Sequence, residues 1–401
     1  MDNISLEQKA LLFLLGQNLF GTPTHELPEV DWQSVIKEAN AQAVFAIAFE
    51  HYAKLPLDPE LAKKVRMSLM QHAMSSASCF QDHTYLHNFV VAHNIPYCAI
   101  KGAASAAYYP DPLLRSMGDV DFYVHPDDIE RAKQAFVAEG FVLDDANHPA
   151  HIGMAKGSKR LEMHFKPVAY HEGKVGDIFL EYWQDIRESA ILNDGDLATY
   201  RGPSTFHHGF ILLAHLQHHL FHEGVGLRHF TDWAVFANSL SNEEFLSVFE
   251  ERLKKIGLFR LAQLLSLGAV KHLGMAHKAW MGDDYETADE LLADIIYGGN
   301  FGRKDRLRSY EGFFIAGRGE GISQRGRLVQ LFYSLNNIVK YNWKWAEKCV
   351  LLYPIGWVYF SARYLIRVLL GKRPMNLRDT YQKSGKRKKM YSKLKVFVPE
   401  E

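Results

Sequence analysis

The sequence predicts an α+β fold in which a small mixed sheet is flanked by N- and C-terminal helical regions. Two changes of pattern support this prediction. Up to residue 94, and again from about residue 203, apolar residues recur at the three- and four-residue spacing of helices. Between these regions, short apolar runs alternate with helical stretches in the order strand, helix, strand, helix, strand, strand. Such a compact block is typical of a sheet with helices packed against it.

The N-terminal region is expected to hold three helices. Ser5 and Gln8 have the spacing of a capping box and predict a helix over residues 5–20. Asp31 is the expected N-cap of a second helix. An apolar stripe that follows two prolines predicts a long third helix from about residue 60 to 93.

The central block is expected to contain the sheet. The strands are predicted at residues 97–100, 119–124, 141–143 and 159–165, with helices around 103–107 and from 126 to 140. A polar loop that contains His148 and His151 is expected before the last strand.

The remaining chain is predicted to be helical. Helices are expected at about 204–223, 228–239, 243–276 and 284–297, with loops at 298–300 and 317–321. The resulting organisation is an N-terminal helical region over 1–94, a sheet core over 95–200, a helical domain over 201–310 and a C-terminal helical extension with a basic tail over 311–401. The tail after residue 371 is expected to be mobile.

Composition narrows the class of protein. The 46 basic residues balance the 46 acidic ones, so a global field for nucleic acid is absent and no long nucleic acid is expected as a partner. Cys79, Cys98 and Cys349 form no CxxC motif and indicate a reduced, cytoplasmic setting. The first residues lack the basic region of a signal peptide, and no segment reaches the ~20 apolar residues of a membrane span.

The pair Asp119 and Asp121 is the strongest chemical signal. Side chains of a strand alternate between its faces, so these two carboxylates share one face while Val120, Phe122 and Val124 point into a core. Adjacent carboxylates repel each other unless a cation neutralises them. Mg²⁺ takes oxygen ligands of this kind together with substrate phosphates, so the pair predicts a metal site for phosphoryl or nucleotidyl transfer. The alternative is a solvated strand edge.

Glu162 is the expected third carboxylate. It lies on a later strand whose alternation puts Arg160, Glu162 and His164 on one face, as in a neighbouring strand of the same sheet. His164, on the face of Glu162, is the histidine of this region that is most expected to contact substrate. Three carboxylates around one or two Mg²⁺ ions can bind a nucleoside triphosphate, and Glu162 or an aspartate can help to deprotonate the acceptor.

Phosphate ligands are expected before the aspartate pair. Lys101 and Gly102 stand between a strand and a helix, where free backbone N–H groups, the positive dipole end and a lysine charge favour phosphate. Arg115 could hold a phosphate bidentately. The alternatives are a turn glycine with a surface lysine, and an arginine that pairs with Asp111 or with the aspartates.

These segments together resemble the uncharacterised nucleotidyltransferase family of the polymerase-β-type nucleotidyltransferase superfamily. The resemblance covers roughly residues 5–370. Its motifs are residues 100–104 (IKGAA), 109–112 (YPDP), 115–124 (RSMGDVDFYV), 161–165 (LEMHF), 215–221 (HLQHHLF) and 223–233 (EGVGLRHFTDW).

The resemblance implies a nucleotidyltransferase core in residues 95–200 and a bacterial, cytosolic enzyme. The implied reaction transfers a nucleoside monophosphate from a nucleoside triphosphate to a small-molecule, saccharide or lipid-linked acceptor. Asp119, Asp121 and Glu162 match the carboxylates of the family. One departure concerns triphosphate binding. Where the wider superfamily has a Gly-Ser pair, this chain has residues 101–104 (KGAA), with Ser105 slightly further on.

Histidines crowd the first helix after the sheet. His215, His219 and His222 have i, i+4, i+7 spacing and line one face, which suits a transition metal, a substrate phosphate or a polar seam between helices. Asp232 could complete a metal site or orient an imidazole, and Arg228 could pair with Asp232 or face a phosphate. The resemblance favours a role in the cleft opposite the carboxylates.

Residues 341–395 combine aromatic, apolar and basic residues. Tyr341, Trp343 and Trp345 precede an apolar run, and Arg363, Arg367, Lys372 and Arg373 follow it. This pattern suits peripheral contact with an anionic membrane, and the alternative is a helix packed on the core.

Three functions follow from these residues. The first is an Mg²⁺-dependent nucleotidyltransferase. The second is a catalytically silent protein that binds a nucleotide or phosphosugar and regulates a biosynthetic complex. The third is a zinc-dependent phosphohydrolase centred on His215, His219 and Asp232.

Overall fold

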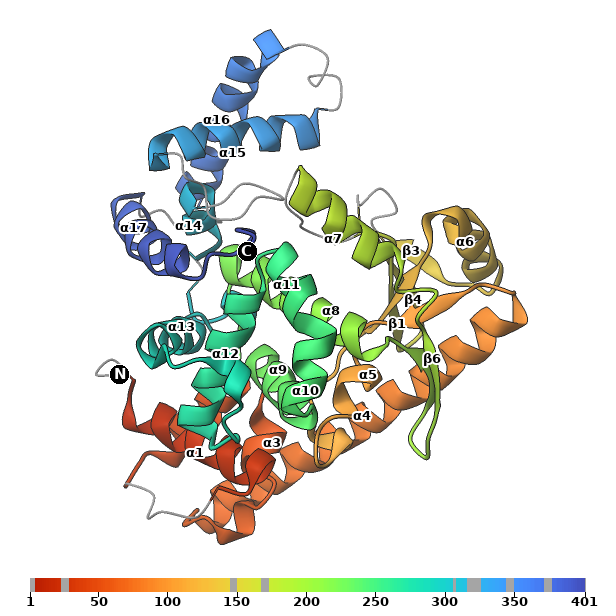
Figure 1. The fold of residues 1–401 in the computed structure, drawn as a ribbon, viewed down its shortest axis with the longest axis vertical. Coiled ribbons are helices and arrows are strands. Elements are labelled where there is room, and N and C mark those ends of the chain that lie inside the picture. Colours follow the sequence, from red (N-terminus) through yellow and green to blue (C-terminus); the bar gives the residue numbers. More distant parts are fainter. Residues whose placement is uncertain are drawn as a thin grey trace.

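The fold is known from a computed structural model. It describes residues 4–22, 29–144, 150–166, 173–305, 308–315, 326–343, 350–370 and 377–400. His148, Trp345, Cys349, Lys372, Arg373 and the loop expected at 317–321 lie outside the described residues. Figure 1 shows the sheet on one side of the molecule, a body of helices beside it, and the α15–α16 pair beyond that body.

The elements follow the predicted alternation. The helices of at least eight residues are α1 (Leu6–Phe20), α2 (Trp32–Ala41), α4 (Pro59–Ala92), α6 (Ile129–Ala138), α7 (Lys174–Gln184), α8 (Thr205–Phe221), α9 (Leu227–Ser239), α12 (Phe259–Leu273), α13 (Tyr285–Gly298), α14 (Arg308–Ile315), α15 (Arg327–Asn342), α16 (Tyr353–Leu369) and α17 (Leu377–Lys393). Shorter helices are α3 (Phe45–Phe49), α5 (Ala103–Ala106), α10 (Asn242–Phe245) and α11 (Glu251–Lys255). The strands are β1 (Tyr97–Ala99), β2 (Val120–Val124), β3 (Val142–Asp144), β4 (His151–Lys156), β5 (Lys159–His164), β6 (Ile191–Asp194) and β7 (Thr199–Gly202).

The main sheet is mixed, as predicted. Its strand order is β1-β2-β5-β4-β3, and β6 pairs with β7 in a separate hairpin. Strands β2 and β5 run parallel, whereas the other pairs of the main sheet are antiparallel. In the parallel pair Asp121 lies opposite Glu162, which confirms that Glu162 stands on the neighbouring strand. The α+β prediction is therefore confirmed.

The expected polar loop around His148 and His151 is wrong where the structure describes it. Residues 151–156 form strand β4, which a tight turn at Gly157 joins to β5. The signal was present in the sequence, because Ile152 and Met154 alternate with smaller or polar residues and are both buried. A glycine with positive φ at the turn is also typical of a short hairpin.

Two apolar cores meet at strand β2. Val120, Phe122 and Val124 pack into the core on one face of the sheet, which also contains Phe136 of α6. Tyr123 points the opposite way, into the larger core formed by the helical body. The alternation predicted for this strand is confirmed, and burial of both faces fixes its register.

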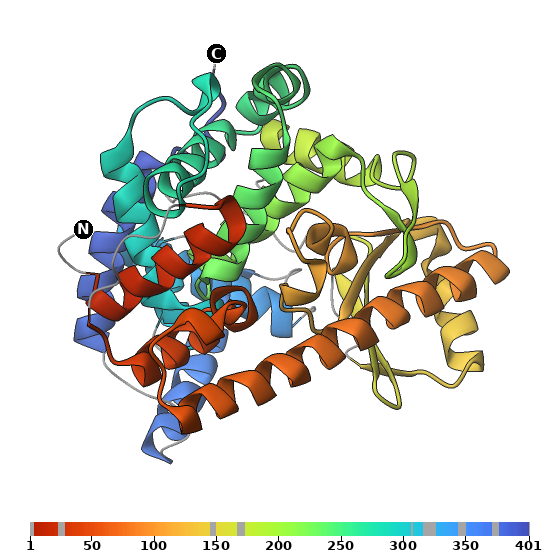
Figure 2. The same ribbon diagram turned by 90° about the horizontal axis from the view of Figure 1, so that it is seen from below.

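Helix α4 connects the two halves of the molecule. Its 34 residues extend over roughly 50 Å at the usual helical rise. It contacts α3 near one end and β7 near the other, and Figure 2 shows it running beneath both the helical body and the sheet. Asp58 caps its first turn, and Pro59 occupies the position where a missing N–H has no cost.

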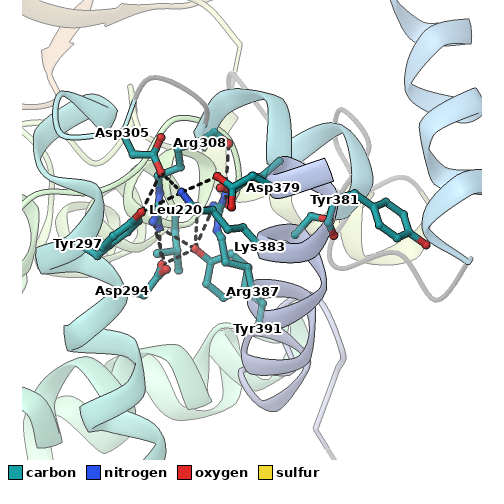
Figure 3. A network of polar contacts seen from close by, with 12 residues as sticks. Leu220, Asp294, Tyr297, Asp305, Arg308, Asp379, Tyr381, Lys383, Arg387 and Tyr391 are labelled. Atoms are coloured by element: carbon teal, nitrogen blue, oxygen red, sulfur yellow. Dashed lines mark hydrogen bonds and ion pairs between the residues drawn. The ribbon is translucent and has the colours of Figure 1, made fainter. Parts of the chain in front are cut away.

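The mobile tail expected after residue 371 is wrong for residues 377–397. These residues include α17, whose Arg387 and Tyr391 are buried against the body. Figure 3 shows the resulting network. Arg387 donates to Glu311 at 2.7 Å and to the carbonyl of Leu220 at 3.0 Å. The Tyr391 hydroxyl lies 2.6 Å from an oxygen of Asp294.

The network extends through a second arginine. Arg308 pairs with Asp294 through both terminal nitrogens and donates to the Tyr391 hydroxyl at 3.0 Å. The spacing of Arg387, Tyr391 and Leu394 places them on one helix face, and Lys386 and Lys389 on the exposed side supply the basic character seen in the sequence. Across the described residues no helix is long and apolar enough to cross a membrane.

Removing a member of this network is expected to destabilise the protein. Arg387→Ala leaves Glu311 as a buried, unpaired carboxylate, which costs about 3–5 kcal/mol of the free energy of unfolding. Urea denaturation followed by circular dichroism measures this loss. Lys386→Ala is the matched control and is expected to stay within about 0.5 kcal/mol of the wild type. Equal stability of the two variants would contradict the packed α17.

Candidate active site

The three predicted carboxylates converge. Asp119 immediately precedes β2, Asp121 lies within β2, and Glu162 stands opposite Asp121 on β5. Each offers an oxygen, and these oxygens all lie within 4.8 Å of one another. Strand alternation puts them on the face that opens to the cleft, because the intervening Val120 is buried in the core.

A lysine and a histidine side chain already contact this carboxylate group. Lys101 donates from Nζ to Oδ1 of Asp121 at 2.8 Å. His164 Nε2 lies 2.9 Å from that oxygen and 2.9 Å from Oε1 of Glu162. His164 shares the face of Glu162, as predicted, but it is buried beneath the carboxylates and does not line the cleft. Its side chain therefore positions the two acids.

The electrostatics of the group follow from these contacts. Burial alone would raise the pKa of Asp121, but Lys101 and His164 outweigh burial and hold it below its usual range. Burial alone would lower the pKa of His164, but its bonds to Asp121 and Glu162 raise it instead. Asp121 is thus an anion, and His164 gains affinity for a proton.

Asp119 behaves differently because it has no cationic partner of its own in the described structure. Loss of hydration inside the cleft, followed by repulsion from Asp121 and Glu162, raises its pKa to about 6. A divalent cation between these oxygens would remove that repulsion. Oxygen donors in this number fit Mg²⁺, which seeks carboxylates and water rather than nitrogen ligands.

A second set of donors adjoins the first. His151 Nδ1 on β4 lies 3.5 Å from Oε1 of Glu162, and His151, Glu162 and His164 also form a group that could hold an ion. β4 was missed as a strand, so this proximity was not predicted. Glu162 belongs to both sets.

The expectation of free amides at the start of α5 is wrong. The N–H of Ala103 donates to His83 Nε2 at 3.1 Å, and those of Ala104 and Ser105 bond to backbone carbonyls. Gly102 has φ +59°, and a Cβ there would lie 2.4 Å from His83 Nε2. Glycine is therefore required for this close approach to His83 rather than for a phosphate.

The predicted phosphate ligands occupy different places. Lys101, Gly102 and Arg115 line a cleft of about 830 Å³ together with the three carboxylates. Ser105 instead lines a cavity of about 20 Å³ behind the cleft. His83, which sequence reasoning missed, lies on α4 far from these residues in the chain, and no local motif marks it.

Arg115 is committed to Asp232. Its Nε and Nη2 donate to the two carboxylate oxygens of Asp232, both at 2.7 Å, and Tyr109 donates to the same carboxylate at 2.7 Å. Because Nε and Nη2 of Arg115 both bond to Asp232, this pair of donors is not free to hold a phosphate bidentately. The pair joins the sheet core to α9, and the phosphate role expected of Arg115 stays a prediction.

Two members of the histidine face reach the cleft that the carboxylates also line, and the role opposite the carboxylates that the resemblance implied stays a prediction. His215 and His219 line the cleft, with their Nε2 atoms 3.1 Å apart. Burial, followed by neighbouring cations, lowers the pKa of His215, and burial also lowers that of His219. Asp232 is used by Arg115, so it does not join His215 and His219 in a zinc site, and none of the metal-capable groups among the described residues includes this trio.

Other lining residues were not predicted. Asn300, Phe301 and Arg303 follow α13 and reach the cleft from a turn that the sequence marked only as a glycine-rich loop. Gln71 and His72 reach it from α4. These positions are distant in sequence from the carboxylates, so spacing alone could not associate them.

A small mixed sheet that presents three carboxylates to a cleft is the arrangement expected of a nucleotidyltransferase. Comparison with protein families agrees with this class. The family model described as uncharacterised nucleotidyltransferase matches residues 28–274, and the chain belongs to that family. Comparison with curated proteins gives no match.

The raised pKa of Asp119 predicts a pH-dependent stability of the metal-free protein. The unfolded chain ionises Asp119 near pH 3.8, whereas the folded protein does so near pH 6. The contribution of the neutral Asp119 carboxyl to the free energy of unfolding is therefore complete below pH 3.8 and is lost as the pH rises through 6. The melting temperature of Asp119→Asn relative to the wild type is expected to rise across this interval in chelator-treated samples.

The matched control for this measurement is Asp196→Asn, at an exposed aspartate outside the cleft. Added Mg²⁺ at pH 7.5 is expected to raise the melting temperature of the wild type more than that of Asp119→Asn, because the variant has lost a ligand. A difference between Asp119→Asn and the wild type that does not change with pH would contradict the assigned electrostatics.

Proposed function

We propose that the protein transfers a nucleoside monophosphate from a nucleoside triphosphate to an acceptor in an Mg²⁺-dependent reaction. The observation that supports this most is the convergence of Asp119, Asp121 and Glu162 at one end of a large cleft. Family membership gives the class of enzyme. The acceptor is proposed to be a small molecule, saccharide or lipid-linked compound.

Each residue of the site has a proposed role. Asp119, Asp121 and Glu162 would hold one or two Mg²⁺ ions, which when bound neutralise phosphate charge and lower the pKa of an attacking hydroxyl. Lys101 bonds to Asp121 and has an ammonium that can turn to a triphosphate oxygen. A carboxylate of the trio accepts the proton of the acceptor. His164 holds Asp121 and Glu162 in place.

A binding protein without turnover is the second candidate, and one observation favours it. The backbone N–H groups at the start of α5 are bonded to His83 and to carbonyls, so they offer no cradle for a triphosphate. In that case the same carboxylates would bind a nucleotide or phosphosugar for regulation. For either candidate we propose a bacterial, cytoplasmic location, which the family resemblance supports.

Nucleotide binding tests the proposal. Titration calorimetry with non-hydrolysable analogues of the four ribonucleoside triphosphates and Mg²⁺ is expected to show binding of at least one by the wild type. Asp121→Asn is expected to weaken it by about tenfold or more, because a metal ligand is lost, whereas Asp196→Asn leaves it unchanged.

Turnover separates the two candidates. With the authentic triphosphate, Mg²⁺ and a bacterial small-molecule extract as the source of acceptor, pyrophosphate release above that of Asp121→Asn supports the enzyme. Binding of a triphosphate by the wild type without such release supports the regulatory protein. Failure of the wild type to bind any of the four analogues would reject the enzyme and also a regulatory protein that binds a nucleotide.

We propose peripheral membrane contact, but through a smaller segment than the residues 341–395 that the sequence indicated. α17 packs on the body, so the contact falls to η8 (Val350–Leu352) and α16. Leu351, Val358 and Leu369 are 85%, 71% and 85% exposed. α15 and α16 contain no acidic residue, and α16 carries Arg363 and Arg367, which complements an anionic lipid surface.

Vesicle co-sedimentation tests this contact. The wild type is expected to sediment with vesicles of phosphatidylcholine and phosphatidylglycerol, and less with phosphatidylcholine alone. Val358→Asp is expected to abolish sedimentation, because a carboxylate on the apolar face opposes insertion. Val137→Asp, at an exposed valine on α6, is the matched control. If Val358→Asp sediments like Val137→Asp, α16 is not the contact.

A further inference from the structure

One set of cleft-lining residues, from α8, α9 and the turn after α13, is rich in cationic and neutral polar groups. It consists of His215, His219, Arg228, Asn300, Phe301 and Arg303, here called the basic wall. Among all described residues that line the cleft, the acids are Asp119, Asp121 and Glu162, and none of these belongs to the basic wall. The three acids, here called the acidic end, and the basic wall thus come from different elements, and the proposed metal site accounts only for the acids.

Arg228 is a cation without an acid partner in the described structure. The carboxylate of Asp232, four residues further along α9, is taken by both donor edges of Arg115. The Arg228 side chain donates only a long hydrogen bond of 3.5 Å to the carbonyl of Ser116. Its Nε is buried and has no hydrogen-bond partner among the described residues. A half-buried guanidinium left in this state is suited to an anionic ligand.

The surroundings of Arg228 increase the need for an anion. Arg303 also lines the cleft, is exposed, and forms no ion pair with any residue of the described ranges. His229, behind Arg228, is only 7% exposed, and neither ring nitrogen has a hydrogen-bond partner in the same part of the chain. Burial, followed by the charge of Arg115, lowers the pKa of Arg228 and outweighs the opposing charges of Asp232 and Asp121.

The turn that carries Phe301 is held in place at a conformational cost. Phe301 has φ 53° and ψ 38°, in the left-handed region that bulky residues seldom adopt. Tight packing fixes this turn against the end of α8, because a Cβ on Gly302 would lie 2.2 Å from the carbonyl oxygen of Glu223. The ring lies beneath the Arg228 guanidinium, 5.5 Å from centroid to Cζ, and touches His219. The strained residue thereby sets the position of Arg228.

We propose that Arg228 and Arg303, positioned by Phe301, form a phosphate subsite for the second substrate, so that the acceptor is a phosphorylated small molecule. This inference rests on the proposed nucleotidyl transfer. The acidic end, with its metal and Lys101, takes the triphosphate, and the basic wall holds the phosphate of the acceptor in the same cleft. The phosphate bound by the basic wall could also come from the triphosphate itself, whose terminal phosphates have the same chemistry.

Binding of inorganic phosphate in metal-free buffer of low ionic strength tests the subsite. The wild type is expected to bind phosphate by titration calorimetry, and Arg228→Gln to bind it about tenfold more weakly or not at all, since a charge-assisted hydrogen bond is lost. Arg303→Gln, on an exposed side chain that does not affect folding, is expected to weaken it as well. Arg201→Gln, at an exposed arginine on β7 that does not line the cleft, is the matched control and is expected to bind like the wild type.

Competition identifies the source of the phosphate. Phosphate that binds with unchanged affinity when a non-hydrolysable triphosphate and Mg²⁺ saturate the protein supports a separate acceptor subsite. Displacement of phosphate by the triphosphate would assign the basic wall to the triphosphate tail and overturn the acceptor proposal. No phosphate binding by the wild type, or equal binding by both cleft variants and Arg201→Gln, would also overturn it.

The proposed nucleotidyl transfer and this subsite can fail separately. Asp121→Asn is expected to lose triphosphate binding while it keeps phosphate binding, because Asp121 lies at the acidic end. Absence of triphosphate binding in the wild type would therefore reject the transfer reaction without affecting the phosphate titration.

Phe301→Gly provides a further readout. It is expected to keep or raise the melting temperature, because glycine tolerates positive φ, and to weaken phosphate binding. A Phe301→Gly variant that binds phosphate as the wild type does would contradict the positioning role of the ring.

Discussion

The parallel pairing of β2 with β5 is the constraint on which the site depends. It sets Asp121 directly opposite Glu162, and a shift of one residue would turn one of the two carboxylates into the core. Apolar burial fixes this register, because Val120, Phe122 and Met163 pack into the core on the sheet face that points away from the carboxylates. Carboxylate repulsion is thus opposed by apolar burial, which holds the acids together before any cation arrives.

The surrounding charges divide into two groups with different tasks. Lys101 and His164 neutralise the acids, and the Arg115–Asp232 pair joins the sheet core to α9 and so fixes one wall of the cleft. Because Arg115 takes both oxygens of Asp232, Arg228 is left without a carboxylate. The buried Arg115–Asp232 pair therefore positions α9 beside the sheet core, and it also leaves Arg228 in the cleft without a carboxylate partner among the described residues.

Much of the fold and the acidic end of the cleft could be predicted from the sequence. The capping box at Ser5 is present as predicted, and the alternation around Asp121 gave the correct face of β2. Strand β4 was missed because a histidine and a glycine hid a short alternating pattern. The tertiary partners of Arg115 and His83 and the strained turn at Phe301 were not predictable, because each depends on a contact between distant segments. The basic stretch of α17 was misread, because Arg387 is buried by acids and carbonyls that the local sequence does not show.

The central claim is that three carboxylates from two paired strands hold a divalent cation. The position of the cation can be measured directly when Mn²⁺ replaces Mg²⁺. The measurement is anomalous diffraction from crystals soaked with Mn²⁺ and a non-hydrolysable triphosphate. The account predicts an anomalous peak within bonding distance of Asp119, Asp121 and Glu162. Bound triphosphate with no peak among these three residues, or a peak elsewhere in the cleft, would contradict it.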